Sequence, residues 1–160
     1  YFEIIRQKTA SLITACCAIG VSSVTNNSEY VKKIKILGEY IGIAFQIKDD
    51  LFDYGSKKIG KPIGIDIKDQ KMTLPFIFCM NNSNSKDKKW LINSIKNHNK
   101  NKKRVKEIIS FVNKNGGIEY AKEKMEEFKL KAVKILKSFS KNKYRDSLEM
   151  TINYVISRNQ

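Results

Sequence analysis

The sequence predicts an all-α fold. Apolar residues recur at three- and four-residue steps along most of the chain, which is the spacing of one face of an α-helix. No stretch shows the strict apolar–polar alternation of a half-buried strand. Short clusters of Gly, Asn, Ser and Pro separate the periodic stretches and mark the turns between helices.

The first helix is predicted over residues 1–20. Lys8 lies on its apolar face, so this lysine either extends along the surface to water or points at an anion in the interior. Residues 25–29 form a turn, and within it Ser28 is expected to cap a helix that runs to about Tyr54. The apolar face of the first helix consists of Ile4, Ile5, Leu12, Ala15 and Ile19.

Glycines and Pro62 interrupt the chain between residues 55 and 66. A further helix is expected over 68–80, with Lys71 and Thr73 in its early turns and Pro75 near its start. A polar connection covers 81–89. The remaining helices are predicted at 90–96, 104–115, 118–139 and 144–157.

The composition excludes several classes of protein. The net charge of +15 invites a nucleic-acid partner, but only four of the 31 basic residues are arginine and the lysines are spread along the chain, so nucleic-acid binding is not expected. Three cysteines without CxxC spacing disfavour a disulfide framework or a zinc site. No apolar run near 18 residues and no secretory signal are found, so we expect a cytoplasmic protein without a membrane span.

Three aspartates form an acidic strip on the second predicted helix. At about 100° per residue, Asp49, Asp50 and Asp53 share one narrow arc with Gln46. Two such charges ~6 Å apart repel by roughly 3 kcal/mol at an effective dielectric constant near 20. Either water solvates the strip or a hard cation such as Mg²⁺ occupies it. A helix cap is the alternative, but the strip ends its own helix and opposes the helix dipole there.

A loop rich in glycine and lysine follows the strip directly, at residues 55–66. Adjacent negative and positive groups suit a ligand made of a metal and phosphate oxygens. The loop is not a P-loop, because GxxxxGK[ST] is absent. Gly42 and Gly38 lie one and two turns before Gln46, which suggests that a neighbouring helix or a ligand approaches closely.

An ordered series of motifs adds a family resemblance. Lys8-Thr9, FQIKDDLFD at 45–53, GKPIGID at 60–66 and QKMTLP at 70–75 together resemble the C-terminal half of the trans-isoprenyl (polyprenyl) diphosphate synthases. The similarity continues through GGIEYA at 116–121 to YVISR at 154–158 and so covers essentially the whole chain. The resemblance implies half of an all-α isoprenoid synthase bundle around a deep cavity.

The resemblance also implies a reaction and a set of site residues. The expected activity is Mg²⁺-dependent head-to-tail condensation of an allylic prenyl diphosphate with isopentenyl diphosphate. In the family pattern Asp49, Asp50 and Asp53 bind the metal, and Lys8, Lys61 and Lys71 hold the allylic diphosphate. Thr9 and Gln46 match polar residues beside the reacting carbon, and with Lys8 they form the expected catalytic set.

The chain also departs from the family pattern. The first aspartate-rich motif is absent, so residues 1–160 are expected to be a single helical region that belongs to a larger synthase domain and is inactive alone. The expected partners are the missing N-terminal half and, in the complete protein, a second copy in a homodimer. The alternative is a non-catalytic diphosphate-binding or regulatory subunit of a heteromeric synthase.

Overall fold

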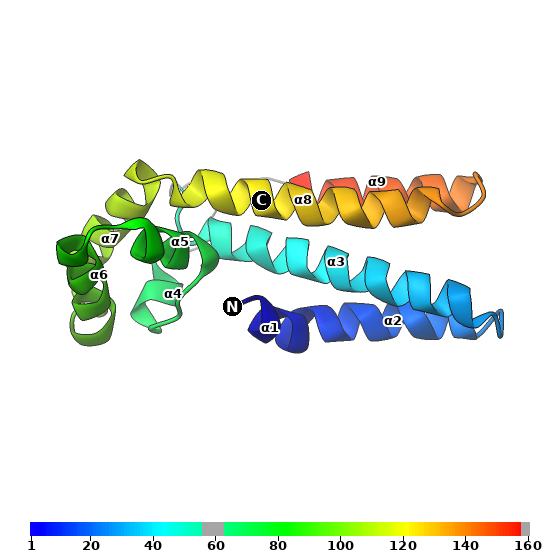
Figure 1. Ribbon diagram of the computed structural model, residues 1–160, viewed down its shortest axis with the longest axis horizontal. Helices are drawn as coiled ribbons and strands as arrows, with labels where there is room; N and C mark the ends of the chain where they lie inside the picture. Colours follow the sequence, from blue (N-terminus) through cyan, green and yellow to red (C-terminus); the bar gives the residue numbers. More distant parts are fainter. Residues whose placement is uncertain (56–62, 158–160) are drawn as a thin grey trace. The chain divides into compact units, whose positions relative to one another are not determined.

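The computed structural model describes residues 1–55 and 63–157, and all regular structure within them is helical. This confirms the predicted all-α class. The first four segments are α1 (Phe2–Ile5), the π-helical turn η1 (Arg6–Ala10), α2 (Ser11–Ser22) and α3 (Ser28–Phe52). The others are α4 (Ile65–Lys68), α5 (Leu74–Asn82), α6 (Ser85–Asn97), α7 (Lys102–Lys114), α8 (Gly117–Lys137) and α9 (Lys143–Ser157) (Figure 1).

The chain divides into two compact units. The first contains Tyr1 with the described residues of 49–123, and the second contains residues 2–48 with the described residues from 124 onward. Helices α3 and α8 each contribute residues to both units. The single helical region expected for residues 1–160 stays a prediction.

The second unit contains a close contact between helix backbones. A Cβ on Gly42 would lie 2.5 Å from Cα of Ala10, and one on Gly38 would lie 3.0 Å from Cα of Thr14. Helix α3 therefore meets η1 and α2 backbone to backbone, which is the close helix approach that the two glycines predict. The buried core beside this contact comes from α3, α8 and α9 and includes Leu37, Ala44, Ala132, Leu136, Ile152 and Ile156.

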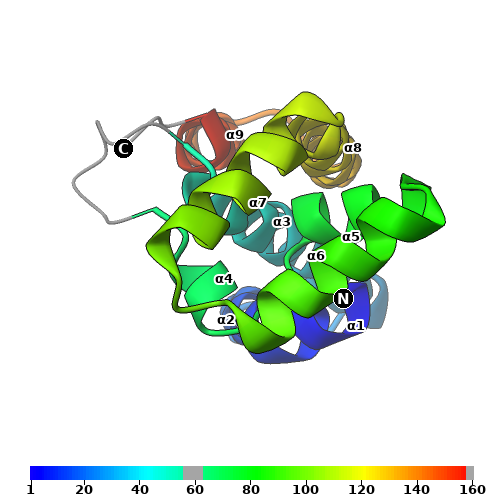
Figure 2. The same cartoon turned by 90° about the vertical axis from the view of Figure 1, so that its left-hand side faces the viewer.

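The first unit has a core of its own, formed by α4 to α7 and the first turns of α8. Figure 2 shows α6 and α7 side by side at the front of this unit. Gly117 begins α8 against α5, because a Cβ there would lie 2.7 Å from the backbone oxygen of Pro75. The fully buried side chains of this core include Ile67, Phe76, Leu91, Ile95, Ile108 and Val112.

The predicted inward face of the first helix is largely wrong. Ile5 is buried, but Ile4, Leu12 and Ile19 are 66%, 70% and 70% exposed, and Ala15 is exposed as well. The cause is η1, whose wider π turn holds more residues than an α turn. The wider turn changes the rotation of the α2 side chains about the helix axis relative to Ile5. As a result, the face that contains Thr14 and Cys17 packs on α3.

The helical run Phe2–Ser22 is long and apolar enough to cross a membrane, judged by length and composition alone. This corrects the expectation that the chain contains no such run. Only 17% of the most apolar window is buried within the structure. Core helices pass the same composition test, so the finding does not by itself establish a membrane span.

Several predicted helix boundaries also need correction. Asn27 rather than Ser28 caps α3, since its side-chain oxygen accepts hydrogen bonds from the backbone of Glu29 and Tyr30. The predicted helix 68–80 is instead α4 and α5, with Lys71 in the non-helical connection. Helix α6 begins at Ser85, five residues before the prediction, because Asn84 caps it. The starts and ends of α7, α8 and α9 agree with the predictions within two residues.

The close contact at Gly42 makes a testable prediction. Gly42→Ala should lower the free energy of unfolding by about 1–3 kcal/mol, because the added methyl meets backbone atoms that cannot turn aside. Gly20→Ala is the matched control: nothing lies within 4 Å of its Cβ position, so it should be neutral or stabilise by up to about 1 kcal/mol. Urea unfolding of the full-length protein measures both, and equal effects of the two substitutions would contradict the contact.

Candidate functional site

The predicted site residues fall into two groups, one in each unit. Thr9, Gln46 and Lys8 belong to the second unit, and the three aspartates and Lys71 belong to the first. Lys61 lies outside the described residues. We describe each group by itself.

Thr9 and Gln46 are joined directly. The Thr9 hydroxyl donates a hydrogen bond to Oε1 of Gln46 at 2.6 Å, although the two residues are 37 positions apart. Thr9 lies on η1 and Gln46 lies one turn after Gly42 on α3. The hydrogen bond is possible because Ala10 and Gly42 bring the two backbones together. Short π turns within helices are frequent at functional sites, which fits the position of this pair.

Lys8 is exposed on the same π turn. Its neighbour Arg6 pairs with Glu3 at 2.6 Å and reaches Glu39 at 4.0 Å. Lys8 forms no ion pair with any residue that the structure describes. Lys8 is therefore exposed to water in this structure, which is the first of the two alternatives predicted from the sequence. Its ammonium group is accessible to an anionic ligand.

The three aspartates have three different environments. Asp49 is exposed, while Asp50 and Asp53 are only 6% and 8% exposed. Asp50 accepts a hydrogen bond from the hydroxyl of Tyr1. Burial and then the charge of Asp50 raise the pKa of Tyr1 well above its ordinary value. Tyr1 therefore stays a neutral donor to Asp50 at physiological pH.

Asp53 lies just after the end of α3 and caps the next helix. Its Oδ1 accepts the backbone N–H of Ile65 at 2.7 Å, and its Oδ2 accepts that of Asp66 at 3.2 Å. The sequence argument against a cap is thus wrong for Asp53, because this carboxylate caps α4 and not its own helix. Burial, followed by the nearby charge of Asp66, raises the pKa of Asp53, while the backbone donors act in the opposite direction.

Gly64 makes this cap possible. Its φ of +75° reverses the chain just before α4, in a conformation that side chains other than glycine rarely adopt. A Cβ at this position would also lie 2.4 Å from Val105. The GKPIGID motif therefore needs its second glycine so that the first N–H groups of α4 can meet Asp53.

Asp66 connects the aspartate motif to Lys71, a role that the sequence analysis missed. Its backbone N–H binds Asp53, and its side chain forms an ion pair with Lys71 at 3.0 Å. Lys71 also pairs with Asp69 at 3.1 Å, and these two carboxylates raise the pKa of Lys71. The spacing of the motif residues does not reveal such a link, because the link depends on the turn at Gly64.

The donor chemistry of the aspartates fits Mg²⁺, because carboxylate oxygens are its usual protein ligands. The raised pKa of Asp53 agrees with this, since a bound cation would offset the cost of burying a carboxylate. Among the residues that the structure describes, however, no three His, Cys, Asp or Glu side chains are grouped so that they could hold a metal ion. The metal ligands therefore stay a prediction.

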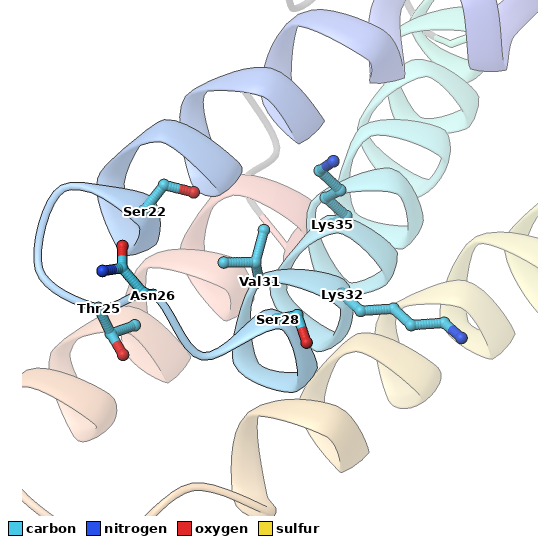
Figure 3. Close-up of a pocket in the computed structure, with 7 residues that line it drawn as sticks. All are labelled: Ser22, Thr25, Asn26, Ser28, Val31, Lys32 and Lys35. Carbon is cyan, nitrogen blue, oxygen red and sulfur yellow. The ribbon is translucent and has the colours of Figure 1, made fainter.

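A surface pocket of about 450 Å³ lies at the turn between α2 and α3 (Figure 3). None of the predicted site residues lines it. Figure 3 shows Lys32 and Lys35 pointing in different directions, so their ammonium groups do not converge on one point. The pocket is lined by Ser22, Thr25, Asn26, Ser28, Val31, Lys32 and Lys35.

The chain is similar in sequence to several known proteins. A family model described as polyprenyl synthetase matches residues 1–112. A short chain isoprenyl diphosphate synthase of Methanocaldococcus jannaschii is 36% identical over 124 residues, which are 76% of this chain and 37% of that protein. Heptaprenyl diphosphate synthase component 2 of Bacillus subtilis is 29% identical over 160 residues, 99% of this chain and 45% of that protein.

Solved structures agree with these matches. The geranylgeranyl pyrophosphate synthase from Bacteroides thetaiotaomicron superposes with a TM-score of 0.91 and 38% identity, over 99% of this chain and 52% of that one. The geranylgeranyl pyrophosphate synthetase from Pyrococcus horikoshii gives a TM-score of 0.88 and 35% identity, over 99% and 49% of the two chains. The chain thus spans about half the length of these relatives or less.

A buried hydrogen bond beside the aspartates can be tested. Tyr54 and Thr73 share a hydrogen bond of 2.7 Å between their hydroxyls, and both residues are buried. Tyr54→Phe should lower the free energy of unfolding by about 1–3 kcal/mol at neutral pH, because Thr73 loses its partner. Tyr144→Phe, at a residue that is 74% exposed, should change it by less than about 0.5 kcal/mol.

The pH dependence of the same variant has a definite sign. Burial raises the pKa of Tyr54 above its ordinary value of 10.0, so the folded protein keeps a proton that the unfolded chain loses. Wild-type stability must then fall as the pH rises above about 10. The Tyr54→Phe variant has no hydroxyl at this position that could titrate, so its stability does not fall for this reason. In chemical unfolding experiments, the difference in the free energy of unfolding between the wild type and Tyr54→Phe should therefore shrink above that pH. A constant deficit across the range would be inconsistent with a buried Tyr54 hydroxyl.

Proposed function

The chain belongs to the polyprenyl synthetase family, and on this premise we propose that it forms the part of a prenyl diphosphate synthase that carries the second aspartate-rich motif. The proposed reaction is the head-to-tail condensation of an allylic prenyl diphosphate with isopentenyl diphosphate. The relatives named above make or elongate isoprenyl diphosphates according to their names.

One observation carries this proposal beyond family membership: the hydrogen bond between Thr9 and Gln46. The two residues belong to separate motifs on separate segments, and both match residues beside the reacting carbon in the family pattern. Their contact supports the proposed catalytic set. The Thr9 hydroxyl donates to Oε1, so it also orients the Gln46 amide toward η1.

The charged residues have complementary proposed roles. Asp49, Asp50 and Asp53 would hold Mg²⁺, which when bound neutralises charge that develops on the departing diphosphate. Lys8, Lys61 and Lys71 would bind the oxygens of the same diphosphate. Lys71 would exchange Asp66 and Asp69 for these oxygens at small cost, because exposed ion pairs contribute only about 0–1 kcal/mol each.

The bond changes of the proposed reaction are balanced within the two substrates. The allylic C–O bond breaks and diphosphate leaves with the electron pair. The double bond of isopentenyl diphosphate then forms the new C–C bond to the allylic carbon, and transfer of one proton to the released diphosphate restores a double bond. Thr9 and Gln46 would lie beside the allylic carbon, where their oxygens stabilise positive charge.

We propose that activity also requires the remaining part of the fold that the longer relatives contain. That part would supply the first aspartate-rich motif, which this sequence lacks. In the complete protein we expect a homodimer in the cytoplasm, with Mg²⁺ as cofactor.

A non-catalytic role is the second candidate. Two relatives are named component 2 of a heptaprenyl diphosphate synthase, from Bacillus subtilis and Geobacillus stearothermophilus. The name indicates an enzyme of more than one component. A subunit that only binds diphosphate or regulates a partner would need no second metal motif, so the presence of all three aspartates favours the catalytic proposal.

The metal assignment is tested by Asp49→Ala in the full-length protein. Turnover of a labelled allylic diphosphate with isopentenyl diphosphate should fall by about 10²–10³-fold, as it does when a preorganised group that stabilises transition-state charge is removed. Glu123→Ala removes an exposed carboxylate elsewhere and should leave turnover unchanged. Near-normal turnover of Asp49→Ala would refute the metal assignment.

The role of Thr9 is tested by a pair of variants. Thr9→Val removes the donor to Gln46 while it preserves the shape of the side chain. It should lower kcat by about tenfold or more, because the Gln46 amide is then no longer held in its orientation. Thr9→Ser keeps the hydroxyl and should retain most of the activity. If both variants lose stability but neither loses kcat, the hydrogen bond is structural only.

A further inference from the structure

Positive charge is concentrated on the hairpin formed by α6 and α7. Residues 85–114 contain nine lysines, one arginine and two acidic residues, so this segment carries +8 of the net charge of +15. Residues 1–55 contain six basic and six acidic residues, and residues 63–84 contain two of each. The lysines are thus spread along the chain unevenly, with their highest density on this hairpin. A general bias toward lysine would not produce this contrast.

The folding of the hairpin leaves these charges at the surface, away from the core. The inner faces of α6 and α7 are buried in the core of the first unit, and Figures 1 and 2 show the two helices side by side. All nine lysines of the segment are exposed. The outer face, named here the lysine face, includes Lys86, Lys89 and Lys96 of α6 and Lys102, Lys103 and Lys106 of α7.

The positive charge of the lysine face is not neutralised within the described part of the chain. The two acidic residues of the hairpin are already engaged: Asp87 accepts a hydrogen bond from the side chain of Asn84 at 2.8 Å, and Glu107 pairs with Arg104 at 3.3 Å. None of the hairpin lysines forms an ion pair with a described residue. Such a surface attracts an extended polyanion.

We propose that the lysine face docks on the anionic surface of a lipid bilayer. Clusters of four to eight basic residues bind anionic leaflets, and each lysine near the surface strengthens binding by roughly fivefold. The face has no exposed large apolar side chain, so the docking is electrostatic and reversible, without insertion into the hydrocarbon.

The chemistry of the hairpin favours lipid over nucleic acid. Base edges are read mainly by arginine, and the only arginine here stacks on Trp90 at 5.5 Å and pairs with Glu107. Single strands need exposed aromatic rings, but the Trp90 ring packs against Phe111 at 5.5 Å. The Asn101 amide is used to cap α7. Lysine ammonium groups act as point charges. Binding to an anionic leaflet requires only such charges.

The choice of a bilayer also rests in part on the proposed function. The product of the proposed reaction joins an anionic diphosphate to a lengthening apolar chain. Such a molecule partitions into lipid, because removal of each CH₂ of the chain from water is favourable. Docking would bring the site of synthesis next to the phase that receives the product.

The test is sedimentation of the full-length protein with lipid vesicles. Vesicles of phosphatidylcholine with about 30% phosphatidylserine supply the anionic surface, and pure phosphatidylcholine is the neutral arm. We expect binding to the anionic vesicles at about 50 mM salt that is lost at about 500 mM salt. Binding to neutral vesicles should be absent.

Two variants with equal net charge locate the surface. The first replaces Lys96, Lys102, Lys103 and Lys106 with Gln, and the control replaces Lys32, Lys35, Lys122 and Lys134, which are also exposed and helical. The hairpin variant should lose affinity for anionic vesicles by about 25-fold or more, and the control by less than about threefold. Circular dichroism and the melting temperature verify that both variants are folded.

Three outcomes would overturn the proposal: equal loss in the two variants, no binding of the wild type, or tighter binding to a single-stranded or duplex oligonucleotide than to the vesicles. Prenyl transfer is measured separately on a short, water-soluble substrate without vesicles. The hairpin variant should keep this activity. A protein that binds vesicles but transfers no prenyl group would refute the proposed reaction, and one that transfers without binding would refute the docking.

Discussion

The contact between Ala10 and Gly42 is the constraint on which the catalytic proposal depends. With no side chain at Gly42, η1 approaches α3 closely enough for the Thr9 hydroxyl to reach Gln46. A larger residue at either position would separate the two backbones. The π turn matters for the same reason, because its extra length sets which side chains of the first helix face α3. The same contact thus determines both the packing of η1 on α3 and the hydrogen bond between Thr9 and Gln46.

The capping role of Asp53 is compatible with the metal-binding role proposed for it. Asp53 stabilises the start of α4 through two backbone N–H groups, and through Asp66 it is linked to Lys71. Each carboxylate oxygen has a second lone pair, so a cap and a metal ligand are compatible roles. Burial without a counterion costs free energy, as the raised pKa of Asp53 indicates. A cation at this position would therefore stabilise the fold as well as bind the substrate.

The distribution of charge separates two kinds of surface within the first unit. Asp50 and Asp53 are buried and held by specific hydrogen bonds, which suits recognition of a defined ligand. The lysines of the lysine face are exposed and form no ion pair with a described residue, which suits a partner whose negative charge is spread over a surface. A net charge of +15 over the whole sequence hides this contrast, because it does not show that more than half of the charge lies on one hairpin.

The sequence by itself determined the all-α class, most helix positions and the family, because apolar periodicity and motif order are local properties of the chain. It also predicted the close approach at Gly42 and selected Thr9 and Gln46, which the fold then brought together. Only the tertiary structure decided which face of the first helix is buried, since one π turn changes the rotation of all later residues. The same holds for Asp53, whose capping of α4 depends on the left-handed turn at Gly64, a contact between segments that no linear spacing specifies.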